Sequence, residues 1–84
     1  MTHRQDVERY AGTLADLAAD CGNLRYDALA FFLHQLARKL ATDAAADAGR
    51  GRPQLAAELQ AASASIGGAA DAVDRAWRIC APHM

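Results

Sequence analysis

Apolar residues recur at alternating spacings of three and four along nearly the whole chain. This spacing predicts helices that each pack through one stripe. The pattern separates into three sets and therefore predicts an all-α protein of three helices. The sets are Val7, Tyr10, Leu14, Leu17 and Cys21; then Tyr26, Leu29, Leu33, Leu36 and Leu40; then Leu55, Leu59, Ala62, Ile66, Ala69, Val73, Ala76 and Cys80.

The ends of the first predicted helix carry their own signals. Thr2 with Gln5 three places later fits a capping box, and Gly22-Asn23 fits a C-terminal stop. The first helix is thus expected to carry the stripe from Val7 to Cys21. The second helix is expected to continue weakly beyond its last leucine and to end at Gly49.

The third stripe runs through Gly67-Gly68 without losing its phase. Two glycines cost about 1 kcal/mol each relative to alanine, so a break is conceivable. A true break usually resets the phase, whereas Ile66, Ala69 and Val73 keep it. We therefore expect one long helix, bent at most at the glycines, with Pro53 in its first turn, where a missing N–H costs nothing.

Short connections make consecutive helices antiparallel neighbours, so we expect a single domain over residues 1–84, an up-down-up three-helix bundle. Aligning the layers pairs Leu33 with Val73 and places Cys21 and Cys80 at the same end. The second and third helices extend beyond the first. This overhang is expected to expose an apolar patch made of Ala44, Ala45, Ala48, Leu55 and Leu59.

Composition sharpens this expectation. About half of the 84 residues are hydrophobic, but much of that is alanine and only 6% are aromatic. Small residues at the contact allow the helices to approach closely but bury little apolar area. The hydrophobic free energy of one chain is therefore small relative to the conformational entropy lost on folding. Soluble monomers seldom leave apolar patches open. We therefore expect a homodimer through the overhang. Phe31, about opposite the leucine seam, is either a solvated aromatic or an interface for another protein.

The connector Arg50-Gly51-Arg52-Pro53 resembles the core of an AT-hook, which implies that Arg50 and Arg52 contact the minor groove of DNA. The resemblance covers four residues, and the flanks lack further Lys or Arg. Since Gly49 and Gly51 suit a helix end and Pro53 a helix start, we interpret the stretch as a corner. The net charge is −1 and both signs are interspersed, so the chain as a whole has no positive potential that would attract nucleic acid.

Candidate chemistry is sparse. Cys21 and Cys80 are interpreted as small core residues; a disulfide, or a partial metal site with His83, is the alternative. His34 lies off the leucine stripe, about two turns from Asp27, and is interpreted as a solvated histidine.

Together these observations predict a small, non-catalytic, cytoplasmic helical protein that acts through protein–protein association, as a homo-oligomer or adaptor. No metal, cofactor or membrane contact is expected. The alternative is a nucleic-acid-associated regulator using Arg50 and Arg52 with Arg38 and Lys39.

Overall fold

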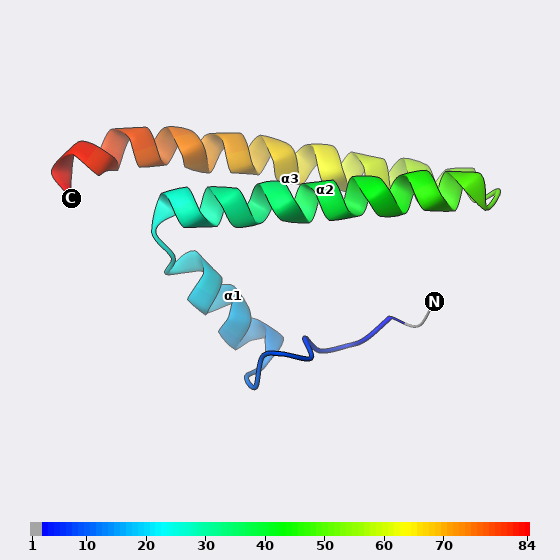
Figure 1. Ribbon diagram of the computed structural model, residues 1–84, viewed down its shortest axis with the longest axis horizontal. Helices are drawn as coiled ribbons and strands as arrows, with labels where there is room; N and C mark the ends of the chain where they lie inside the picture. The colour runs from blue at the N-terminus through cyan, green and yellow to red at the C-terminus, as the bar shows by residue number, and fades with distance from the viewer. Residues whose placement is uncertain (1–2) are drawn as a thin grey trace.

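The structure is a computed structural model that describes residues 3–84. Its elements are α1 (Leu14–Gly22), α2 (Tyr26–Gly49), α3 (Pro53–Cys80) and a short 3-10 turn, η1 (Ala81–His83). Helices α2 and α3 lie side by side as an antiparallel hairpin, and α1 slants away from the start of α2 (Figure 1). The all-α helical bundle is confirmed, no strand occurs in the described residues, and both long helices extend beyond α1.

The two long helices have the predicted extents. Helix α2 ends at Gly49, and α3 begins with Pro53 in its first turn. Helix α3 continues without a break through Gly67 and Gly68 for 28 residues. A Cβ atom built on either glycine would meet no non-local atom within 4 Å, so neither glycine is required by a close helix crossing.

The corner between α2 and α3 is a Schellman motif. Gly51 adopts a positive φ of 74°, which glycine tolerates without a Cβ penalty. The Arg52 N–H donates to the Asp47 carbonyl at 3.0 Å, and the Gly51 N–H donates to the Ala48 carbonyl at 3.2 Å. The interpretation of this stretch as a helix corner is confirmed.

Small residues spaced seven apart form the contact between α2 and α3. The seam consists of Ala30, Ala37 and Ala44 on α2 and Ala56, Ser63 and Ala70 on α3, all buried. The Ser63 hydroxyl donates to the Ala37 carbonyl at 2.7 Å, so the two backbones approach closely. The leucine stripe, predicted as the centre of the contact, instead flanks the seam; Leu36 is 37% exposed. The physical reason is size, because alanines let long helices pack closely and leucines do not.

The predicted start of the first helix is wrong. Helix α1 begins at Leu14, after the N-cap Thr13, whose hydroxyl accepts the Asp16 N–H while the Asp16 carboxylate accepts the Thr13 N–H. This capping box sets the start locally. Gln5 lies outside any helix, and Thr2 lies outside the described residues. Helix α1 buries no residue, and the extensive packing in the described chain is between α2 and α3, so α1 is not seated on the hairpin.

Candidate functional site

One side of the hairpin carries large apolar side chains from both long helices. At about 100° per residue, these side chains fall on one flank of the alanine seam. Leu40, Leu55 and Leu59 line a common groove of about 500 Å³ near the corner. The charged residues Asp43, Asp47, Arg50 and Arg52 and His3 of the N-terminal segment line it too. We call this side the apolar face; it consists of Leu29, Leu33, Leu36, Leu40, Leu55, Leu59, Ile66 and Val73.

The structure regroups the patch that the sequence predicted. Leu55, 45% exposed, and Leu59, half-buried, do lie together in the groove, but their neighbour from α2 is Leu40. Ala44 is buried in the seam, so the hairpin itself already covers it. Ala45 and Ala48 are exposed but do not line the groove, because the helix turns them away from its leucine flank. The groove therefore combines leucines of both helices with charged residues of the corner, and none of the three predicted alanines lines it.

The apolar face is only partly covered: Leu36 and Leu55 are exposed, and the other six of its side chains are half-buried. The buried apolar residues of the described chain are five alanines, and no large side chain is fully buried. Helix α1 and the segment before it lie on the side of the hairpin below α2, but α1 diverges from it (Figure 1). Other exposed large hydrophobic residues, such as Val7, Leu14 and Ile79, lie outside this face.

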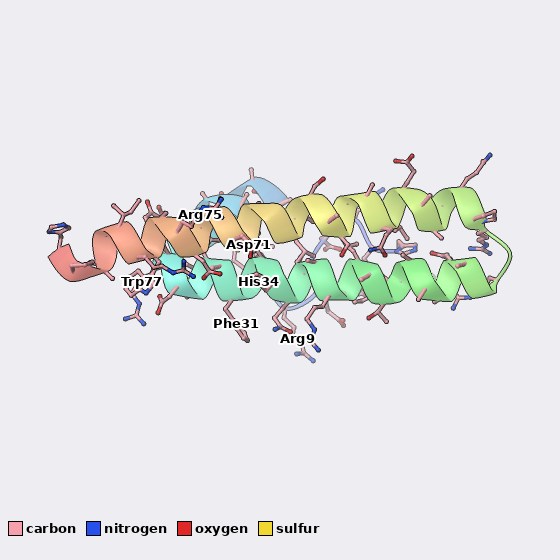
Figure 2. All side chains as sticks on the ribbon, turned by 90° about the horizontal axis from the view of Figure 1, so that it is seen from above. Arg9, Phe31, His34, Asp71, Arg75 and Trp77 are labelled. Atoms are coloured by element: carbon pink, nitrogen blue, oxygen red, sulfur yellow. The ribbon has the colours of Figure 1, made fainter. Side chains whose placement is uncertain are left out.

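Phe31 is separate from this face. It is 66% exposed and points outward from the edge of α2 (Figure 2). Since helical geometry places it well away from the leucine flank, a partner seated on the apolar face would not contact it.

The two arginines of the corner already have a counter-charge. The Arg50 Nη1 atom lies 3.4 Å, and the Arg52 Nη1 atom 3.7 Å, from the Asp47 Oδ1 atom, whose side chain is only 11% exposed. Lys39 is likewise paired, with its Nζ atom 2.6 Å from the Asp43 carboxylate. Paired cations have less net charge to offer phosphate groups, and the corner holds both arginines beside a carboxylate.

A polar cluster that sequence analysis missed lies on the opposite side of the seam. The His34 Nε2 atom is 3.0 Å from the Asp74 Oδ2 atom and 3.8 Å from the Asp71 Oδ1 atom, so α2 and α3 meet through these side chains (Figure 2). His34 is therefore not simply solvated. The signal was present in the layer alignment: if Leu33 faces Val73 in an antiparallel pair, residue 72 is level with His34, and Asp71 and Asp74 lie within one turn of it.

Asp27, the carboxylate nearest to His34 in sequence, serves another partner. The Arg25 guanidinium donates to both Asp27 oxygens, at 2.7 and 2.8 Å, and holds the pKa of that carboxyl below its usual range. The Arg25 Cζ atom also lies 5.3 Å from the centre of the Trp77 ring, a cation–π distance. Arg25 thus links the start of α2 to the end of α3.

The two cysteines have free thiols and are half-buried. Cys80 lines a shallow pocket with residues 22–26, the segment that joins α1 to α2 and directly follows Cys21. The group of metal-ligating side chains in the described residues is His34 with Asp71 and Asp74, and it includes neither thiol.

Fold and surface together define a class: an antiparallel helical hairpin with an alanine seam, one open apolar face and a polar cluster opposite. Among the described helices, none combines the length and the apolar character needed to cross a membrane. Comparison with protein-family models, with curated proteins and with solved structures gives no match.

Proposed function

We propose that this is a non-catalytic helical protein that acts by association, and that its first partner is a second copy of the same chain. The observation that carries the proposal is surface area. The chain exposes 6378 Å², whereas a compact monomer of 8.9 kDa exposes about 4,800 Å². Its radius of gyration is 15.1 Å, against about 12 Å for a compact chain of this length.

The excess surface matches what a stable dimer needs. A standard interface buries about 800 Å² on each partner, which is less than the excess that this chain exposes. Leucines flank the seam on both long helices, and Leu36 and Leu55 among them are exposed. Burying such side chains supplies the free energy that five buried alanines do not.

A two-fold contact is the simplest way for identical chains to cover one face each. In the proposed dimer the apolar face of one hairpin packs on the apolar face of the other, giving a four-helix arrangement. The groove of Leu40, Leu55 and Leu59 is part of that contact. Phe31 stays outside this contact and remains accessible to a further protein. We expect the protein to be cytoplasmic.

The solution mass tests this proposal. Sedimentation and light scattering, at about 1 to 100 µM chain to bracket a nanomolar-to-micromolar dimer, should give twice the 8.9 kDa of one chain. A chelator in the buffer excludes dimers bridged by metal. A folded, cooperatively unfolding monomer at tens of micromolar would overturn the dimer and leave the apolar face as a docking site for a different protein.

The alternative, a nucleic-acid-associated regulator using Arg50 and Arg52, is separated by titrating duplex DNA at several salt concentrations. A regulator must bind with a steep dependence on salt. The ion pairs of both arginines with Asp47 favour weak binding or none.

A further inference from the structure

We propose that His34, Asp71 and Asp74 form a binding site for a divalent transition-metal ion of the zinc type, clamping α2 to α3. One potential ligand atom from each of the three residues lies within 4.8 Å of the others. The site joins two helices across 40 residues of sequence, so a bound ion would tie the hairpin together well away from its corner.

The spacing of the atoms fits tetrahedral coordination. Zinc binds imidazole nitrogen and carboxylate oxygen at about 2.0–2.1 Å, which places neighbouring ligand atoms about 3.3 Å apart. The two distances from the His34 Nε2 atom, 3.0 Å to Asp74 and 3.8 Å to Asp71, lie on either side of this value. Small rotations of the exposed Asp71 side chain would equalise them.

Charge gives a second, independent reason. Two carboxylates from one turn of α3 face the same point, and within residues 3–84 their ion-pair partner is His34 alone. Arg75 adjoins Asp74 in sequence but pairs with neither carboxylate in the described structure. The two carboxylates bring two negative charges to one point, where a divalent cation would neutralise both.

The donor set selects the class of ion. One imidazole with two carboxylates suits zinc and its neighbours in the first transition row, whereas magnesium and calcium prefer oxygen ligands alone. The side chains of His34, Asp71 and Asp74 are 41%, 64% and 38% exposed, so an ion can enter from solvent and keep water in its fourth position.

Metal binding by the full chain tests the site, with Zn²⁺ as the probe and Co²⁺ as its spectroscopic substitute. Calorimetry on chelator-treated protein should find one Zn²⁺ per chain, unaffected by millimolar Mg²⁺, and Co²⁺ should give visible absorption. Added Zn²⁺ should also raise the unfolding temperature, because the ion binds the folded hairpin.

Variants locate the ion. His34→Ala and Asp74→Asn should each weaken Zn²⁺ binding about tenfold or more, whereas His83→Ala, which also removes one histidine, should leave it unchanged. If either variant loses the helical signal, Asp71→Asn at the exposed third ligand replaces it. Unchanged affinity in these variants, loss of binding in Cys80→Ser, or no binding at about 100 µM Zn²⁺ would each overturn the site.

Discussion

The two long sides of the α2–α3 hairpin share one alanine seam but differ in what they lack. On the apolar face, leucines flank the seam and remain partly exposed, so that side lacks a hydrophobic cover. On the opposite side, His34 faces Asp71 and Asp74, and within the described residues it is their ion-pair partner. The seam brings the helices close without burying much area, and we propose that a second chain completes one side and a cation the other.

The largest effect is expected from a charge placed on the apolar face, which tests whether this face is the dimer interface. Leu59→Asp should weaken the dimer at least about 100-fold, because an unpaired carboxylate would be buried at the contact. Phe31→Ser is the matched control, and it should leave the dimer intact. Sedimentation equilibrium of both variants measures the difference.

Leu59→Asp could also unfold a marginal chain, so Leu59→Ala serves as a milder variant with a smaller loss of affinity. A dimer that tolerates Leu59→Asp unchanged would place the interface elsewhere.

The seam itself gives the next largest effect. Ala70 is fully buried against α2, so Ala70→Leu should push the helices apart and lower the free energy of unfolding by about 1–3 kcal/mol. Ala72→Leu adds the same atoms at an exposed position of α3 and should change stability little. Urea denaturation of the two variants compares them; equal stabilities would mean that the helices do not meet at the alanines.

The contrast between the two sides also shows which parts of the structure the sequence could predict. The extents of α2 and α3 follow from local signals, namely Gly49, Pro53 and the phase kept through Gly67-Gly68, and local signals suffice for long amphipathic helices. The start of α1 was missed because the stripe from Val7 suggested a helix, whereas the capping box of Thr13 with Asp16 sets its beginning.

The surfaces were harder to predict because they depend on how the helices rotate against each other. Periodicity identified the apolar flank, and with it Leu55 and Leu59, but not that alanines would occupy the centre of the contact. The His34 cluster required the register of α2 on α3, because its partners lie 37 and 40 residues away. The layer alignment contained that register, although it was built on leucine contacts rather than on polar neighbours.

A smaller effect is expected at the two glycines in the middle of α3. Gly67→Ala with Gly68→Ala should raise the free energy of unfolding by up to about 2 kcal/mol, because alanine favours helix by about 1 kcal/mol at each position. Both sites have open space for a Cβ atom. Thermal unfolding followed by circular dichroism measures the gain; a large loss would show that a glycine is needed at a contact between chains.

The smallest effect concerns α1, which lies on the apolar side without covering it. The Thr13 N–H donates to the Asp16 carboxylate at 3.0 Å, and this hydrogen bond lowers the pKa of Asp16 below its ordinary value. Because the Asp16 pKa is lower in the folded helix than in the unfolded chain, where it is about 4, the ionised carboxylate stabilises the helix above that pH. This contribution is lost as the pH falls through the pKa of Asp16 in the folded helix. On acidification below about pH 4, amide protection of residues 14–22 should therefore decrease.

Thr13→Ala should cause a similar loss at neutral pH, costing about 1 kcal/mol of local helix stability. If hydrogen exchange shows α1 fraying while the mass of the dimer stays constant, α1 contributes nothing to covering the apolar face, and the interface belongs to the hairpin alone. If the dimer dissociates as α1 frays, α1 is part of the interface, and the two-fold contact must include it.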